Sequence, residues 1–294
     1  MFQANMLPII LALLSSVAFA ASQIIIRKNI EESNHLNISL TVTIMGNIVL
    51  WPIAILYTDF SLLNLEGILL FLLAGFLAPG LARLVYFKGM KTVGISVNSS
   101  IFSTYPLYTS IIAVTVLGEV LTTQNWIGLV CIIAGVIFIS KTLDKSSLTK
   151  HATIKGLIIP VLGSFTMAFS QIIRKEGLNI YNQPLLGVAI GYTTSLIFYL
   201  IVLFFSKTDN VSKFSKKDFK LFWKSGVGIA TGWLLSFLAL SQEMVSIIVP
   251  LLQTELLFIL LFSYIFLRKI EKFSFSIVTS ALLIIAGIIL ISFN

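Results

Sequence analysis

The sequence contains little cysteine, histidine or charge, and each shortage excludes a class of protein. A single cysteine, Cys131, cannot form a disulfide within the chain, which excludes a disulfide-stabilised scaffold. The two histidines, His35 and His151, stand far apart without neighbouring carboxylate clusters, so we expect neither a metal centre nor an enzyme built on one. Charged residues make up only 11% of the chain, whereas about 25% is usual in a soluble domain.

Apolar residues account for 57% of the chain, and the mean hydropathy is +1.00. They form continuous runs of about 20 residues, the length of helix that crosses a bilayer. Continuous runs are typical of helices rather than of strands, so we predict an all-α, multi-pass membrane protein. Its ten expected transmembrane helices cover residues 7–26, 37–57, 65–87, 93–117, 122–140, 154–173, 184–205, 219–241, 245–267 and 274–293.

Two stretches from the first half of the chain recur in the second half. LSSVAFAASQII (14–25) matches LGSFTMAFSQII (162–173) at seven of twelve positions, and each copy is followed by an Arg-Lys pair, one residue later in the first. IIAGVIFIS (132–140) matches IIAGIILIS (284–292), and at the same spacing Glu119 aligns with Glu271 and Gly80 with Gly232. The pattern predicts a duplication of five helices, with repeats at 1–146 and 147–294.

An odd number of helices makes the second repeat enter the membrane in the opposite direction to the first. The expected fold is therefore two inverted five-helix repeats, an arrangement found in secondary transporters with a site near the bilayer midplane. The duplication also decides how the stretch 14–28 is interpreted. VAFA followed by AS resembles a signal-peptidase site, but no Lys or Arg precedes it and the stretch recurs in mid-chain, so we interpret it as a transmembrane helix.

The excess of basic residues is interpreted as a topology signal rather than as a nucleic-acid-binding surface. The formal net charge is +8. All of the 20 Lys and Arg residues except Arg83, Arg174 and Lys175 lie in or beside the connections between helices 1 and 2, 3 and 4, 5 and 6, 7 and 8, and 9 and 10. Because basic loops stay in the cytoplasm, we predict that both termini lie outside it, in a prokaryotic-type cell membrane.

The segments ARLVYFKGMKTVGIS (82–96) and STYPLYTSIIAVTVLGEVLTTQNWIGLVCIIAGVIFIS (103–140) resemble the EamA-type transporters of the drug/metabolite transporter superfamily. The resemblance extends over nearly the whole chain. It implies ten helices in two inverted repeats and a central cavity lined mainly by helices 1, 3, 4, 6, 8 and 9. Many members keep both termini in the cytoplasm, unlike the orientation that the loop charges predict. No single substrate is implied, because the superfamily transports amino acids, sugars, nucleotide-linked sugars, amines and drugs.

Polar residues within the spans indicate which helices surround a cavity, because an unsatisfied polar group in hydrocarbon is costly. Helix 4 carries eight hydroxyl or amide residues within twelve positions, whereas helices 5 and 10 are almost purely apolar. For a single Ser or Thr, ordinary helix packing is the simpler explanation. The candidate substrate-binding residues are Gln23, Arg83, Tyr86, Asn98, Ser99, Ser103, Tyr105, Gln171, Trp233, Gln253 and Glu255.

Glu255 is the most informative of these residues, because it is expected near the centre of helix 9 among apolar neighbours such as Leu251 and Phe258. Burial at such a position disfavours a charged carboxylate. Glu255 could carry a coupling proton or neutralise a cationic substrate. The alternative is a carboxyl group with a structural role only, either protonated or hydrogen-bonded to helix 4.

Three other charged residues have competing interpretations. Arg83, near one end of helix 3, either extends its side chain to the cytoplasmic interface, pairs with Glu255, or contacts an anionic group of the substrate. Glu119 and Glu271 stand at equivalent positions at the ends of helices 4 and 9. Each could cap the start of the next helix or take part in gating.

The function predicted is secondary transport of a small neutral, zwitterionic or cationic metabolite or drug by alternating access, with proton coupling left open. Phosphate-bearing cargo normally needs several cations, and Arg83 is the only basic residue well inside an expected span. The alternative is a lipid or lipid-linked substrate flippase, or an accessory membrane subunit. The partners expected are a small-molecule substrate and the bilayer, with no cofactor and no nucleic acid, for a monomer or homodimer.

Overall fold

The computed structural model describes residues 6–29, 32–93, 95–143, 154–205, 216–266 and 275–292, and these are helical apart from short connections, with no strand among them. The part before residue 144 consists of α1 (Met6–Asn29), α2 (His35–Tyr57), η2 (Phe60–Leu62), α3 (Leu65–Gly75), η3 (Phe76–Leu81), α4 (Ala82–Val93), α5 (Ile95–Phe102), α6 (Tyr105–Val116) and α7 (Thr123–Leu143). The part after residue 153 consists of α8 (Ile154–Ile180), α9 (Pro184–Phe205), α10 (Lys216–Leu240), α11 (Val245–Leu252), α12 (Glu255–Phe266) and α13 (Phe275–Ser292).

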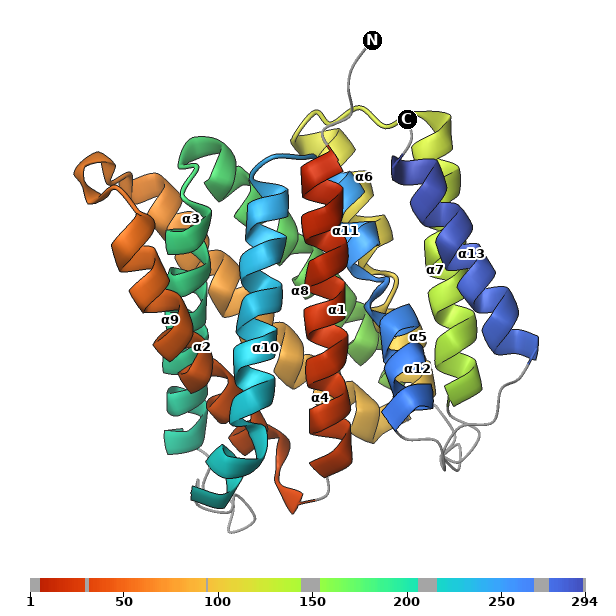
Figure 1. Cartoon of the computed structure of the whole chain (residues 1–294), viewed down its shortest axis with the longest axis horizontal. Coiled ribbons are helices and arrows are strands. Elements are labelled where there is room, and N and C mark those ends of the chain that lie inside the picture. Colours follow the sequence, from red (N-terminus) through yellow and green to blue (C-terminus); the bar gives the residue numbers. More distant parts are fainter. Residues whose placement is uncertain are drawn as a thin grey trace.

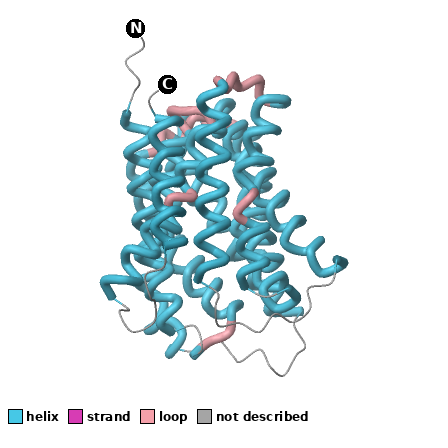
Figure 2. The backbone as a smooth tube through the Cα atoms, turned by 90° about the vertical axis from the view of Figure 1, so that its right-hand side faces the viewer, coloured by secondary structure: helices cyan, strands magenta, loops and turns pink. Residues whose placement is uncertain are grey.

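The helices form a bundle, and the start of α1 and the end of α13 lie at the same end of it (Figures 1 and 2). Within the described residues, seven stretches are long and apolar enough to cross a membrane: Met6–Asn29, His35–Tyr57, Leu65–Val93, Lys155–Ile180, Pro184–Phe205, Lys216–Leu240 and Val245–Phe262. Thr123–Phe138 and Thr279–Ser292 are shorter apolar helices. The prediction of a helical, multi-pass membrane protein is confirmed, whereas the count of ten crossings stays a prediction.

Contacts between helices follow the internal repeat. α1 packs along α10, and α8, which carries the second copy of the repeated stretch, packs along α3 and α4. α2 packs against α9, and α7 against α13. Figure 1 shows α7 and α13 as a pair at one side of the bundle. Exchanging the two halves of the chain therefore regenerates these helix contacts.

Glycines let α7 and α13 approach closely. Gly135 and Gly287 stand at the same position of the repeated IIAG sequence. A Cβ atom on Gly135 would lie 2.7 Å from the carbonyl oxygen of Ser280, and one on Gly287 would lie 2.6 Å from that of Gly128. No larger side chain fits without moving a backbone, which is how small residues typically bring membrane helices together.

Three expected helices differ in the structure. Helix 6 was expected to end at residue 173, but α8 continues to Ile180, so Arg174 and Lys175 lie within a helix rather than in a loop. Helices 4 and 9 were each expected as one span, and each is interrupted by a two-residue turn, at 103–104 between α5 and α6 and at 253–254 between α11 and α12. Glu255 is therefore the first residue of α12 instead of lying in mid-helix.

Candidate functional site

The first helix break leaves backbone carbonyl groups that need a hydrogen-bond donor. Pro106 lacks the N–H group that would donate to the carbonyl oxygen of Phe102 within a continuous helix. The hydroxyl group of Ser164, on α8, lies 3.0 Å from that oxygen and 2.8 Å from the carbonyl oxygen of Ile101. A side chain from the other half of the chain thus satisfies the break.

The second break is satisfied in the same way by the first half of the chain. The hydroxyl group of Ser16, on α1, lies 3.1 Å from the carbonyl oxygen of Leu252 and 3.3 Å from that of Leu251. Ser16 and Ser164 are equivalent residues of the repeated stretch. The breaks also contact each other, because Nε2 of Gln253 donates to the carbonyl oxygen of Ser103 at 2.9 Å.

Replacing Ser164 with alanine should lower the free energy of unfolding by about 1–2 kcal/mol, because a buried carbonyl group loses its donor. The measurement is the thermal unfolding midpoint of the purified protein in detergent. Ser22→Ala is the matched control, since that hydroxyl donates to Ala18 of its own helix at 2.7 Å. Equal midpoints for both variants would show that the serine does not stabilise the break.

The residues that follow the two turns, Tyr105 and Glu255, add titratable groups beside the breaks. Tyr105 begins α6 and is only 6% exposed, and Glu255 begins α12. The side chain of Gln23, on α1, lies within hydrogen-bonding reach of the Glu255 carboxyl group. Tyr105 is in electrostatic range of Glu255. The structure therefore brings Gln23, Tyr105 and Glu255 to one region.

Arg174 is the largest polar side chain buried near this region, and it is 2% exposed. Its Nη1 atom donates to Oε1 of Gln171 at 2.6 Å. Its Nη2 atom lies 3.3 Å from the carbonyl oxygen of Ala78 and 3.4 Å from Oγ of Ser170. All three acceptors are neutral. Tyr105 is in electrostatic range of Arg174 as well as of Glu255.

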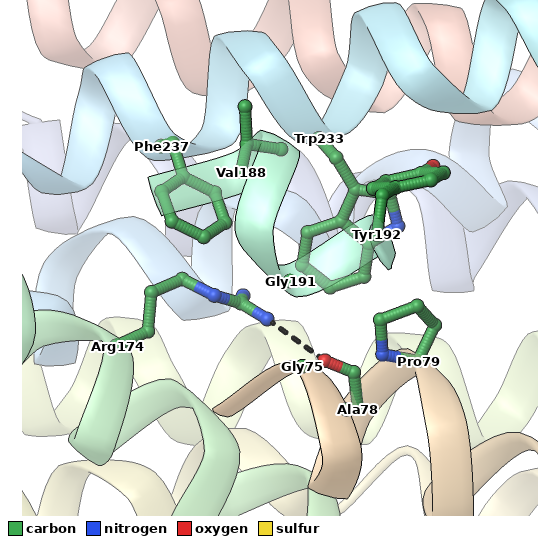
Figure 3. Close-up of a pocket in the computed structure, with 9 residues that line it drawn as sticks. All are labelled: Gly75, Ala78, Pro79, Arg174, Val188, Gly191, Tyr192, Trp233 and Phe237. Carbon is green, nitrogen blue, oxygen red and sulfur yellow. Dashed lines mark hydrogen bonds between the residues drawn. The ribbon is translucent and has the colours of Figure 1, made fainter. Parts of the chain in front are cut away.

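Aromatic rings enclose the other side of the guanidinium group. Its central carbon lies 4.3 Å from the ring centroid of Trp233 and 4.7 Å from that of Phe237, distances typical of cation–π contacts. The same groups line a cavity of about 10 Å³, which has room for about one water molecule. Figure 3 shows the cavity between α10, α9, α8 and the segment from Gly75 to Pro79.

Three candidate residues form a separate contact between α4 and α5. Nδ2 of Asn98 donates to the carbonyl oxygen of Tyr86 at 3.2 Å, and the Tyr86 hydroxyl group lies 2.8 Å from Oγ of Ser99. Tyr86 is in electrostatic range of Glu255, but its hydrogen bonds are to α5, the neighbouring helix. Asn98 and Ser99 thus join two helices and are not brought to the cavity beside Arg174.

Arg83 does not pair with Glu255, since the two form no ion pair within 4.0 Å in the part of the chain that the structure describes. Its side chain lies within hydrogen-bonding reach of the Tyr199 hydroxyl group on α9. That hydroxyl group also donates to the carbonyl oxygen of Pro79 at 2.6 Å. Of the three interpretations of Arg83, the ion pair with Glu255 is therefore not formed in this structure, and the other two stay predictions.

Glu119 caps a helix, but the helix belongs to the other half of the chain. Its two carboxylate oxygens accept from the backbone N–H groups of Val245 and Ser246 at 2.8 and 3.0 Å, and the Ser246 hydroxyl group also donates to it. The capped helix is α11, whereas a cap on the next helix was expected. Gly118, with φ of +69°, makes the turn that precedes Glu119. Glu271 lies outside the described residues.

Replacing Glu119 with alanine should lower the free energy of unfolding by about 1–2 kcal/mol, because the first N–H groups of α11 lose their acceptor. Glu243→Ala is the control, since the Glu243 side chain accepts only a local bond from Met244 at 2.9 Å. Thermal midpoints of the two variants in detergent give the comparison. A midpoint for Glu119→Ala that equals that of Glu243→Ala would contradict a stabilising cap.

Sequence reasoning overlooked Arg174, which was placed in a loop. A signal was nevertheless present, because the Arg-Lys pair follows Ser-Gln one residue sooner in the second copy than in the first, and one residue turns a side chain by about 100° around a helix.

Among the described residues, no group of three or more His, Cys, Asp or Glu side chains could hold a metal ion.

Comparison with known proteins agrees with this architecture. The model of the EamA-like transporter family matches residues 6–141 and 154–293. An uncharacterized transporter of Archaeoglobus fulgidus is 22% identical over 288 residues, which cover 97% of this chain and 98% of that protein. A solved crystal structure superimposes with a TM-score of 0.78 at 10% identity, over 96% of this chain and 95% of the other, and shows the fold alone. The chain is a member of the EamA-like transporter family and, by its apolar helices, a multi-pass integral membrane protein.

Proposed function

We propose that this membrane transporter is a secondary carrier that moves a small neutral, zwitterionic or cationic metabolite by alternating access. Ten membrane helices in two inverted five-helix repeats would provide the scaffold. Two features support this: the helix contacts are regenerated when the halves are exchanged, and α1 and α8 run in opposite directions along the bundle (Figure 1).

The observation that carries the proposal is the meeting of two broken helices. The breaks touch through Gln253 and Ser103, and each is capped by a serine from the opposite repeat. Broken helices at a repeat interface leave polar backbone groups at membrane depth, which is tolerated where they surround a binding site. Glu255 follows one break and is the carboxyl group best placed to meet a cationic or polar group of the solute.

Alternating access requires contacts that close one end of the bundle and can open. Glu119 ties the end of α6 to the start of α11. Nearby in the fold, Nζ of Lys175 donates to the carbonyl oxygens of Leu240 and Glu243, at 2.9 Å each. The Glu119 contact joins opposite repeats, so rocking of the repeats would break it, whereas the Lys175 contacts hold α8 to the end of α10 within the second repeat. The loop charges place this end outside the cytoplasm in our proposal.

The test is uptake by purified protein in liposomes. Proteoliposomes are preloaded with unlabelled amino acids, amines, sugars or drugs and are assayed for counterflow of the labelled solute. We expect counterflow of at least one soluble class and none in empty liposomes. Absence of all counterflow together with scrambling of a fluorescent lipid would favour a flippase instead. Repeating the assay with and without a pH gradient measures proton coupling.

A further inference from the structure

We propose that Arg174 is the anion-binding residue of the transport site and that it takes a carboxylate group of the transported solute. This inference rests on the proposed function, because the bound solute is a transported one only if the protein is a carrier. The cavity beside Arg174 is formed by α8, α9, α10 and the segment around η3, so elements of both repeats surround the guanidinium group.

Arg174 breaks the symmetry of an otherwise symmetric scaffold. The two copies of the repeat share Ser-Gln, and in this alignment Arg174 stands opposite Ile26. Ile26 is partly buried against the apolar core, and the neighbouring Arg27 is exposed. One residue fewer in the second copy turns the arginine by about 100° from the outer face of the helix into the interior. A bilayer scaffold does not need a buried cation at this position, as the first copy demonstrates.

The electrostatic surroundings of Arg174 are incomplete. Its hydrogen bonds go to an amide, a carbonyl and a hydroxyl oxygen, and no carboxylate lies within 4.0 Å of it among the described residues. Nε of Arg174 and Nε2 of Gln171 are buried without any hydrogen-bond partner. A cation inside a membrane protein is retained where it meets a counter-charge or lines a substrate path. Both unpartnered nitrogens are donors, so the missing group is a hydrogen-bond acceptor. Because the guanidinium charge is also uncompensated, that acceptor carries negative charge.

A carboxylate fits this site better than a phosphate group. The planar guanidinium fork matches the two oxygens of a carboxylate, whereas a phosphate dianion normally requires several cations. Lys175 is engaged with the carbonyl oxygens of Leu240 and Glu243. Arg83 is in electrostatic range of Tyr192, which lines the cavity. Its hydrogen-bonding partner, however, is Tyr199. Arg174 thus supplies a single charge to the cavity.

The cavity as it stands admits about one water molecule, so a solute must displace its wall. Trp233 forms the wall nearest to Arg174 and packs edge-on against Phe19 of α1, with ring centroids 5.5 Å apart. Movement of α1 against α10 would therefore displace Trp233 and widen the cavity beside the guanidinium group. Binding of the carboxylate and rocking of the repeats are coupled through this aromatic contact.

The experiment measures ligand-induced thermal stabilisation of the purified full chain, and counterflow in liposomes, with solute pairs that differ by one carboxylate. The pairs are L-leucine with 3-methylbutylamine and L-lysine with 1,5-diaminopentane; a 2-oxo acid, glycerol phosphate, glucose and sodium chloride complete the panel. The variants are Arg174→Met and Arg174→Lys, with Arg27→Met and Arg27→Lys as matched controls on the equivalent helix. Gel filtration reports folding of each variant.

We expect carboxylate-bearing members to stabilise the wild-type protein. Arg174→Lys should raise the half-maximal concentration at least tenfold, Arg174→Met should abolish the effect, and the Arg27 variants should match wild type. If Arg174→Met does not fold, the test uses Arg174→Lys. A half-maximal carboxylate concentration for Arg174→Lys equal to that of the wild-type protein would overturn the proposal. Stabilisation by chloride, by glycerol phosphate or by the amines to the same extent as by the acids would also overturn it.

Failure of this inference and failure of the proposed function give different results. Counterflow of the carboxylate-bearing solutes that is unchanged in Arg174→Met overturns the carboxylate site and leaves a transporter. Stabilisation by carboxylates that depends on Arg174, without counterflow of any solute, supports the anion site but contradicts transport. The absence of both stabilisation and counterflow with every solute tested overturns both.

Discussion

Replacing Glu255 with glutamine should reduce the initial uptake rate of the transported solute at least about 30-fold, because losing the carboxylate that meets a cationic group of the bound solute costs about 2–5 kcal/mol and each 1.36 kcal/mol is tenfold. Glutamine keeps the length of the side chain and can still bond to Gln23, which lies within hydrogen-bonding reach of the carboxyl group. The change therefore removes charge and titration without removing volume. Radiolabelled uptake into proteoliposomes measures it.

Glu66→Gln is the matched control, because Glu66 is an exposed carboxyl group in the first turn of α3 and its loss changes the net charge equally. We expect uptake by this variant to match wild type. Two results distinguish the roles of Glu255. If it binds a cationic group, exchange and net uptake fall together. If it carries a coupling proton, uptake driven by a pH gradient is lost while exchange persists. Wild-type behaviour of Glu255→Gln in both assays would contradict either role.

Replacing Gly75 with alanine should destabilise the protein by about 1–3 kcal/mol or more, the cost typical of overpacking. A Cβ atom on Gly75 would lie 2.4 Å from both the Cα atom and the carbonyl oxygen of Gly191 on α9. Both are backbone atoms, so the clash cannot be relieved by rotating a side chain. The end of α3 would have to move away from α9, together with the segment that forms the cavity beside Arg174.

Gly191→Ala probes the same contact from the other side. A Cβ atom there would lie 3.6 Å from the Cα atom of Gly75, which is ordinary van der Waals contact. Both substitutions gain similar helix propensity, about 1 kcal/mol, so the difference between their thermal midpoints isolates the steric clash. We expect Gly75→Ala to unfold at a clearly lower temperature and Gly191→Ala at or above the wild-type temperature. Equal midpoints would show that the close approach of α3 and α9 is not required.

Much of the helical framework was predictable because a bilayer imposes a local rule. A helix must present about 20 apolar residues in succession, and that signal can be read without knowing any long-range contact. Helix lies within each of the ten expected ranges. The duplication was visible for a related reason: equivalent helices meet equivalent surroundings, as Ser16 and Ser164 do at the two breaks.

The breaks themselves were not readable from local sequence. Pro106 and Pro250 permit kinks in helices 4 and 9, but Pro250 lies inside α11, and Leu256 stands where Pro106 does after the turn, so the prolines do not place both breaks. What the two breaks share is a serine donor from the opposite half of the chain. A carbonyl group can leave its helical partner when another donor replaces it, and that donor is distant in sequence. Glu119 is similar, because its capped helix begins more than a hundred residues later.

The sequence by itself determined a duplicated, helical membrane protein of the EamA-like type, because apolar length and repeated residues are properties of single segments. The tertiary structure decided which polar residues meet. It buried Arg174 beside Gln171 while leaving Arg27 exposed, and it brought Glu255 to Gln23 at the start of a broken helix. These outcomes depend on the phase of each helix and on donors from the opposite repeat, which no single stretch of sequence contains.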